Sequence, residues 1–390
     1  MEAYARSIAL LNKVSTEKGF LASANDITNY RRVWARDGVI CSLAALLDGD
    51  EALVQTAKAT LVTLAEHQHQ LGNIPSNVFF DKPKTLLSFG GLAGRVDTVS
   101  WFIIGVCNYA HLTGQTNFAK AHIEHLNKGL SLMEAWEFNT NHLMYVPRSG
   151  NWADEYITEG YILYDQLLRV WALRCYHQLF PAQEMEDKIR NIERKVVENY
   201  RKKQTTDKPY HPRAYKQLQE KAYWVASFNP SGYQEQFDAL ANAIGILLDL
   251  DDKSSFSSEV ISYAEELRAS LKLNLLPAFW PPITEEDADW NLLENNCKYE
   301  FRNVPFEFHN GGTWQMVNGF YGAALCQHNK TEAAEEVLQQ IHQLNEAEDW
   351  AFYENFNTDT GEVTGVPHCA WSAAGAVILQ QYLNGKKLMI

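Results

Sequence analysis

The stretch NWADEYITEG at residues 151–160 places three acidic side chains among aromatic ones; these residues are Trp152, Asp154, Glu155, Tyr156 and Glu159. Hydrolysis of a glycosidic bond needs two carboxyl groups with different pKa values. One donates a proton to the leaving oxygen, and the other is ionised and activates water or attacks carbon. The alternative is the solvated start of a helix, where acidic side chains interact favourably with the helix dipole.

Similar mixtures of acidic and aromatic residues recur along the chain. Their carboxylates are Asp37, Asp97, Glu235, Asp238 and Glu354, and their aromatic residues are Trp34, Trp101, Trp314, Trp350, Phe352 and Tyr353. Aromatic faces suit sugar rings, although a large helical core also uses many aromatic residues. Apolar walls raise the pKa of a carboxyl group. We therefore expect Trp152 and the charge of Glu155 to offset the helix dipole and to keep Asp154 protonated.

Other chemistries have little support in the sequence. It contains no G-x-x-x-x-G-K-[ST] phosphate loop, no H-E-x-x-H metal motif and no G-x-S-x-G elbow. The net charge of −14 argues against a nucleic acid or an anionic membrane as partner. The six cysteines are scattered and are expected to be reduced. We expect a carbohydrate partner, no cofactor and no metal. Without a visible signal peptide or an apolar run of membrane-spanning length, we also expect a cytoplasmic protein.

The elements that must position these residues are predicted to be helices, in a single catalytic domain over residues 1–390. Apolar residues recur with helical spacing in twelve stretches, namely 2–18, 36–47, 51–69, 97–113, 117–137, 159–180, 183–203, 235–249, 256–271, 313–327, 331–345 and 368–384. Residues 142–150 are compatible with a short hairpin arm, and residues 201–213 with an exposed loop.

Twelve helices suit an all-α fold, an (α/α)6 toroid in which six hairpins form an inner and an outer ring. Helices alternate in direction in such a ring, so all even-numbered helices begin on one face. Every unusual acidic or aromatic cluster precedes an even-numbered helix. We therefore predict that long loops bring all six clusters to one mouth of the toroid.

Four segments resemble families of (α/α)6 glycoside hydrolases. RNVPFEFHNGGTWQM (302–316) is similar to the HNGG-x-W segment of alkaline/neutral invertases. RVWARDGVICSLAALL (32–47), VDTVSWFI (96–103) and FDALANAIGIL (237–247) resemble segments of glycogen-debranching (amylo-α-1,6-glucosidase) enzymes and their relatives. With FYENF around Glu354, the matches run in order from about residue 30 to 375.

The resemblance implies an inverting glycoside hydrolase with Asp154 as general acid and Glu354 as general base. It also implies sugar contacts, by Arg36, Asp37 and Asp97 in one subsite and by His309, Asn310, Gly311, Gly312 and Trp314 in another wall. We add the neighbouring aromatic residues Trp34, Trp101, Trp152 and Tyr353 as candidate substrate-binding residues.

Several alternatives remain open at this point. EYITEGYILYDQ follows Asp154 where the invertases have basic residues and a turn, which favours a small α-glucoside or oligosaccharide over sucrose. A sugar 2-epimerase also uses this toroid, with two histidines that face each other, here His309 and His368. In a non-catalytic sugar-binding toroid, the two carboxylates lie too far apart to flank one bond. Asp154 and Asp97 are also compatible with helix caps, and Glu354 with an exposed loop.

Overall fold

The computed structural model describes residues 2–81, 83–202, 209–250 and 255–390. Each predicted helical stretch contains a helix, and the shorter helices α5, α9 and α12 accompany them. The helices are α1 (Glu2–Lys13), α2 (Ala35–Asp48), α3 (Glu51–Glu66), α4 (Asp97–Leu112), α5 (Thr116–Ala121), α6 (Ile123–Ala135), α7 (Leu163–Leu179), α8 (Gln183–Asn199), α9 (Pro212–Gln217), α10 (Ala239–Leu247), α11 (Phe256–Ser270), α12 (Trp290–Glu294), α13 (Gln315–Gln327), α14 (Thr331–Trp350) and α15 (Ala370–Leu383).

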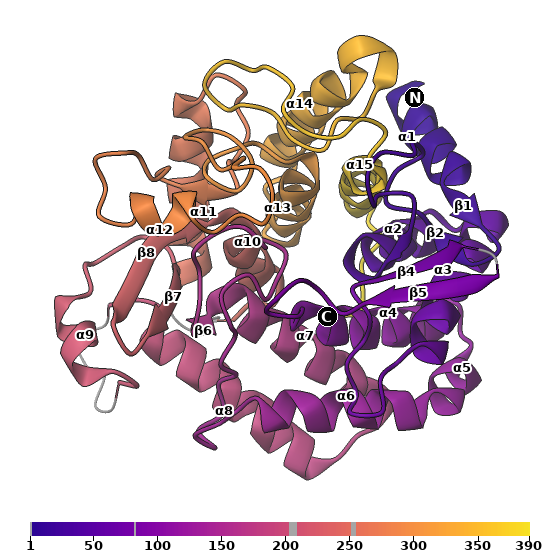
Figure 1. The fold of residues 1–390 in the computed structure, drawn as a ribbon, viewed down its shortest axis with the longest axis horizontal. Helices are drawn as coiled ribbons and strands as arrows, with labels where there is room; N and C mark the ends of the chain where they lie inside the picture. Colours follow the sequence, from indigo (N-terminus) through magenta and orange to yellow (C-terminus); the bar gives the residue numbers. More distant parts are fainter. Residues whose placement is uncertain (1, 82, 203–208, 251–254) are drawn as a thin grey trace.

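Six of these helices form a closed inner ring (Figure 1). Each packs on the next in the order α2, α4, α7, α10, α13 and α15, and α15 packs back on α2. The helices α1, α3, α6, α8, α11 and α14 lie around them. The sequence explains the two rings. The inner helix α4 is buried from Asp97 to Ala110, whereas the outer helix α8 buries only Ile189, Ile192, Val196 and Asn199. The helical part therefore fits the predicted toroid.

The prediction of an all-α chain is not confirmed, because the loops carry short antiparallel strands. The strands are β1 (Ser15–Thr16), β2 (Gly19–Phe20), β3 (Val33–Trp34), β4 (Asn77–Asp81), β5 (Lys84–Ser88), β6 (Tyr161–Ile162), β7 (Val225–Asn229), β8 (Gly232–Asp238) and β9 (Phe279–Trp280). They pair in the orders β1–β2, β3–β4–β5 and β6–β7–β8–β9. Strand β8 takes the first residues of the helix predicted over 235–249.

Two further expectations concern loops. Residues 142–150 contribute a single antiparallel bridge, between Val146 and Gly160, rather than a hairpin arm. Of the loop predicted over 201–213, residues 203–208 lie outside the described part of the chain, and α9 begins at Pro212.

The centre of the ring is filled by side chains. Trp101, Trp171 and Phe320, from three inner helices, contact one another with ring centroids 5.9–6.3 Å apart. The C-terminal segment crosses the ends of α4 and α7, and the C terminus lies near the middle of the ring in Figure 1. There the Met389 carbonyl accepts a hydrogen bond of 2.7 Å from the Trp171 indole. All six cysteines are free. No described helix has both the length and the apolar character needed to cross a bilayer.

Candidate active site

The beginnings of the inner helices are joined by buried polar contacts. Arg36, in the first turn of α2, forms an ion pair of 2.8 Å with Asp97 at the start of α4. The Tyr164 hydroxyl of α7 donates to the same Asp97 oxygen at 3.2 Å. The Trp101 indole in turn donates to the Tyr164 oxygen at 2.9 Å. Of the six helix starts predicted to meet at one mouth, these contacts join those of α2, α4 and α7.

Asp154 lies in the loop that precedes α7 and pairs with an arginine that the sequence did not single out. The Arg95 guanidinium contacts the Asp154 carboxylate at 2.5 Å. Burial raises the pKa of Asp154, but the positive charges of Arg95 and Arg36, together with the nearby His309, outweigh burial and lower it. The expectation that the surroundings keep Asp154 protonated is therefore wrong for this free state. The cause is the contact with Arg95, which no pattern in the sequence indicated.

Glu354 lies in the loop that precedes α15 and has the opposite surroundings. Its side chain is almost completely buried, and the Tyr30 hydroxyl lies 3.0 and 3.1 Å from its two oxygens. Burial raises the pKa of Glu354 to about 7, with the nearby charges of Asp37 and Asp154 acting in the same direction. Trp152, two residues before Asp154, contacts Trp314 with ring centroids 5.7 Å apart, and the Gln315 amide donates to the carbonyl of Tyr353, beside Glu354, at 3.0 Å. The loops that carry the two candidate carboxyls are therefore joined through the start of α13.

Asp37 is the carboxylate best suited to a ligand. It follows Arg36 in α2, and burial raises its pKa to about 6. Among the described residues, no other side chain hydrogen-bonds its carboxylate, although Arg36, Asp97 and Asp154 act on it electrostatically. A carboxylate has more acceptor sites than the backbone hydrogen bond at Asp37 fills, which makes Asp37 a suitable acceptor for sugar hydroxyls.

Trp152, His309, Trp314 and Trp371 form an aromatic wall beside these carboxylates. The His309 ring stacks on Trp314, with centroids 5.1 Å apart, and meets Trp152 edge-on at 5.0 Å. Trp314 also meets Trp371 edge-on at 5.7 Å. Burial lowers the pKa of His309 to about 3, so its imidazole is neutral. Its Nδ1 atom and the indole nitrogens of Trp152 and Trp371 are buried without a protein partner and are available to a ligand.

The HNGG turn supports this wall and offers little to a substrate. Asn310 is fully buried, and its amide exchanges hydrogen bonds with the backbone of Ile283 and also donates to the Asn303 carbonyl. Gly311 has φ of +95°, and a Cβ on Gly312 would lie 2.5 Å from the Phe308 oxygen. These three residues therefore support His309, and the predicted contact of this turn with a sugar stays a prediction.

The remaining candidate aromatic residues make hydrogen bonds to other parts of the protein. Trp101 is completely buried in the barrel centre and supports Tyr164. Trp34 is half-buried, and its indole donates to the Asn29 carbonyl at 2.9 Å. The Tyr353 hydroxyl turns to Glu348 at the kinked end of α14. The Trp101 and Tyr353 side chains therefore have protein partners, and their predicted contact with a sugar stays a prediction.

Other acidic residues of the predicted rim have separate partners. Asp238 caps α10, accepting from the Ala241 amide at 2.9 Å. Glu235 faces Lys221 at 3.6 Å. Glu155 pairs with Arg302 at 3.1 Å, and Arg302 also acts on Glu354.

The two histidines of the epimerase alternative do not share surroundings. The charges that act on His309 are those of Asp154, Arg302, Arg36 and Arg95, whereas the charge that acts on His368 is that of Lys13. Among the described residues, their rings make no contact with each other.

Sequence reasoning missed three residues of the site, Tyr30, Arg95 and Arg302. Arg302 opens the quoted segment RNVPFEFHNGGTWQM, and Arg95 directly precedes the quoted segment VDTVSWFI, so their positions near the motifs could have indicated them. Tyr30 lies in an irregular segment, TNYRR, with no periodicity to mark it.

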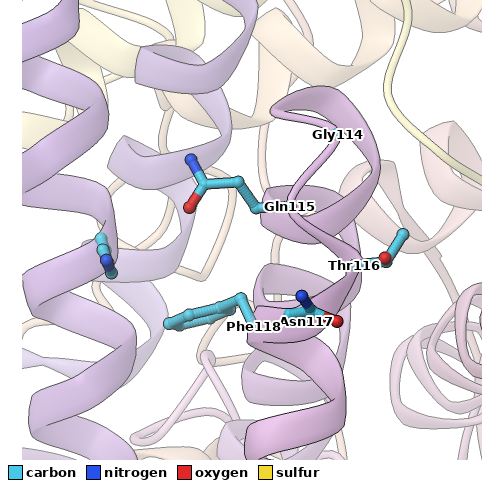
Figure 2. Close-up of a pocket in the computed structure, with 6 residues that line it drawn as sticks. Gly114, Gln115, Thr116, Asn117 and Phe118 are labelled. Atoms are coloured by element: carbon cyan, nitrogen blue, oxygen red, sulfur yellow. The ribbon is translucent and has the colours of Figure 1, made fainter.

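Two cavities in the described part of the chain are lined by residues other than these carboxylates. One lies beside α12 and is lined by Glu286, Trp290, Phe301 and their neighbours. Figure 2 shows a cavity lined by Lys58 and by residues 114–118, beyond the C-terminal end of α4. Asp97 lies at the other end of that helix, roughly 24 Å away for 16 residues. Within the described ranges, no group of three or more His, Cys, Asp or Glu residues is arranged to hold a metal ion.

Comparison with known proteins identifies the family. A family model described as alkaline and neutral invertase matches residues 6–206 and 213–386. The chain belongs to the alkaline and neutral invertase family. The members of this family are glycoside hydrolases, which agrees with the resemblance seen in the sequence and with the carboxylates at the mouth.

Individual relatives are distant. The chain is 22% identical to alkaline/neutral invertase CINV2 of Arabidopsis thaliana, over 98% of this chain and 78% of the relative. It is also 22% identical to the mitochondrial alkaline/neutral invertase C of the same plant, over 43% of this chain and only 24% of that relative. Because one relative is mitochondrial, the predicted cytoplasmic location stays a prediction.

A solved structure shares the fold. The mannosylglycerate hydrolase of Thermus thermophilus aligns with a TM-score of 0.70 and 12% sequence identity, over 97% of this chain and 99% of that one. At this identity, the likeness supports the toroid and leaves the substrate open.

Proposed function

We propose that this single catalytic domain hydrolyses an α-glucosidic bond in a small glucoside or oligosaccharide with inversion. Asp154 is the general acid and Glu354 the general base. The observation that carries the proposal is the packing that joins the loops of the two candidate carboxyls through Trp314 and Gln315, in a family of glycoside hydrolases.

The reaction needs no group beyond these side chains and water. Glu354 accepts a proton from a water molecule as the water oxygen attacks the anomeric carbon. The bond from that carbon to the glycosidic oxygen breaks, and the proton of Asp154 passes to the leaving oxygen. Asp37 and Asp97 accept hydrogen bonds from hydroxyls of the sugar that holds the anomeric carbon, and Trp152 and Trp371 offer their indole N–H groups.

Sucrose is the second candidate substrate, favoured by the match to the alkaline and neutral invertase family. The segment after Asp154 favours other α-glucosides. Hydrolysis assays with sucrose, maltose and isomaltose in parallel separate the two. Under an inverting mechanism, NMR during the first minutes detects β-glucose as the initial product. Initial release of α-glucose instead would exclude inversion.

The variants Asp154→Asn and Glu354→Gln test the two roles. Each keeps the shape of the side chain but cannot donate or accept the required proton, so kcat should fall by about 10²–10⁴-fold. Binding of the glucoside, measured by calorimetry, should be retained. Glu159→Gln serves as the matched control, with kcat unchanged, since Glu159 is half-buried and pairs with Arg148 at 2.8 Å. Near-normal kcat in either site variant would remove that residue from the mechanism.

A further inference from the structure

Arg95 is fixed by the backbone, whereas Asp154 is fixed chiefly by Arg95. One guanidinium nitrogen donates to the carbonyls of Gly94 and Ser149 at 2.9 and 2.6 Å, and the other contacts Asp154. Among the described residues, no other side chain hydrogen-bonds the Asp154 carboxylate. The Asp154 side chain is 31% exposed, against 10% for Arg95. If this pair separates, the carboxylate is therefore the partner that moves.

This contact conflicts with proton donation. A carboxylate held against a guanidinium is ionised and has no proton to give. The neighbouring negative charges of Asp37, Glu155 and Glu354 favour a proton on Asp154, whereas Arg36 and Arg95 oppose it. The neutral ring of His309 completes these surroundings. When the Asp154 carboxylate separates from Arg95, the charges of its acidic neighbours have the stronger effect and favour the protonated form of Asp154.

We propose that Arg95 is a positioning residue that holds Asp154 away from its proton-donating state until a substrate binds. The leaving part of the substrate presents hydroxyl oxygens to the Arg95 guanidinium, these oxygens replace the carboxylate, and Asp154 takes a proton from solvent. This inference rests on the proposed function. It identifies the substrate class as glycosides whose leaving group carries hydroxyls beside the glycosidic oxygen, as a second sugar does.

The test compares Arg95→Gln, Arg95→Lys and the unaltered enzyme on two substrates. One is the best disaccharide from the hydrolysis assays. The other is the α-glucosyl fluoride, which has no leaving sugar to contact Arg95 and needs little proton donation. The pH profiles of kcat and kcat/KM are recorded for both, and thermal melting confirms that each variant folds.

The pH profile of kcat/KM reports groups of the free enzyme. In the free enzyme Asp154 has the lower pKa of the two carboxyls, so the acidic limb of the profile falls at the pKa of Asp154 and the alkaline limb at that of Glu354. Loss of the positive charge in Arg95→Gln raises the pKa of Asp154. The acidic limb for the disaccharide therefore moves to higher pH, by about one unit or more. The KM for the disaccharide rises in this variant, whereas the KM for the fluoride changes far less. Arg95→Lys keeps the charge, so its acidic limb stays close to that of the unaltered enzyme.

Two outcomes would overturn the inference. An acidic limb that does not move in Arg95→Gln means that Arg95 does not govern Asp154. Equal losses on the disaccharide and the fluoride mean that Arg95 only supports the fold. The variant Asp154→Asn distinguishes failure of the proposed function from failure of this inference. If Asp154→Asn is inactive on the disaccharide while the acidic limb does not move in Arg95→Gln, the proposed function stands and this inference fails.

Discussion

At the residue scale, the site sets two carboxyls in contrasting environments. Asp154 faces a guanidinium at 2.5 Å, and Glu354 is buried against a phenol. In the free state Glu354 therefore has the higher pKa and Asp154 the lower, the reverse of what an acid and a base require. Because the two groups interact, the limbs of a pH profile belong to the pair. Substrate contacts must change at least one of these environments.

Tyr30 offers a second test at this scale. Its hydrogen bond favours the ionised form of Glu354, so Tyr30→Phe should raise the pKa of Glu354 above about 7. Hydrolysis of the glucosyl fluoride depends on ionised Glu354 and needs little proton donation. The midpoint of the acidic limb of its pH profile should therefore move to higher pH in Tyr30→Phe.

Tyr161→Phe is a matched control, because Tyr161 lies outside the site and its hydroxyl accepts from Asn139. A midpoint in Tyr30→Phe that stays in place or moves to lower pH would show that Tyr30 does not stabilise the base.

Residue types predicted the two carboxyls but not how each candidate would act. Trp101 and Asn310 were predicted to bind substrate, yet both are buried and support other residues of the site. Residues that contact a sugar and residues that hold them in place are of the same polar and aromatic types. The sequence alone therefore does not distinguish the two roles. Tyr30 and Arg95 could not be assigned because their roles arise from contacts 324 and 59 positions along the chain.

At the scale of elements, the HNGG turn fixes the aromatic wall through close backbone contacts. Gly312→Ala would place a Cβ 2.5 Å from the Phe308 oxygen and 2.6 Å from its nitrogen, where backbone must shift. Overpacking of this kind costs about 1–3 kcal/mol. Urea denaturation should show this loss in the free energy of unfolding.

Gly91→Ala is the control, since a Cβ at Gly91 meets nothing within 4 Å and its φ is not positive. Its unfolding free energy should change by less than about 0.5 kcal/mol. Equal stability of the two variants would show that the turn tolerates a side chain.

Helices were predictable at this scale because their apolar spacing extends over many residues. Strands were not, since most have only two to five residues, and β5 is exposed on both faces. Such strands form where loops happen to pair, and alternation of apolar and polar residues does not mark them. β8 was taken for the start of a helix because its apolar residues continue into α10.

At the scale of the whole molecule, the alternation of helix direction carried the prediction that six separate clusters meet. The contacts between α2, α4 and α7 confirm this for the polar residues, and the wall of Trp152, Trp314 and Trp371 extends it to α13 and α15. The ring could be predicted from the number of helices, whereas the loop conformations that orient each side chain could not.

The C-terminal segment stabilises the opposite end of the ring. Leu388 and Met389 are buried, and the Met389 backbone bonds the Asn108 amide and the Trp171 indole. Removal of residues 388–390 should lower the free energy of unfolding by about 1.5–3 kcal/mol for each buried side chain. Per folded molecule, kcat should stay near normal, because Asn108 lies far along α4 from Asp97.

Lys387→Ala, at an exposed position, is the control and should leave unfolding unchanged. Chemical denaturation and active-site titration measure the two quantities. Unchanged stability after the removal would mean that the segment is not part of the cooperative fold.

The aromatic residues packed at the ring centre also decide the route that a ligand can take. With Trp101, Trp171 and Phe320 in contact there, the described side chains close the centre of the ring. A ligand that reaches the carboxylates from the mouth therefore leaves by the mouth. In the proposed reaction both product sugars take that route, so they compete with the next substrate for it.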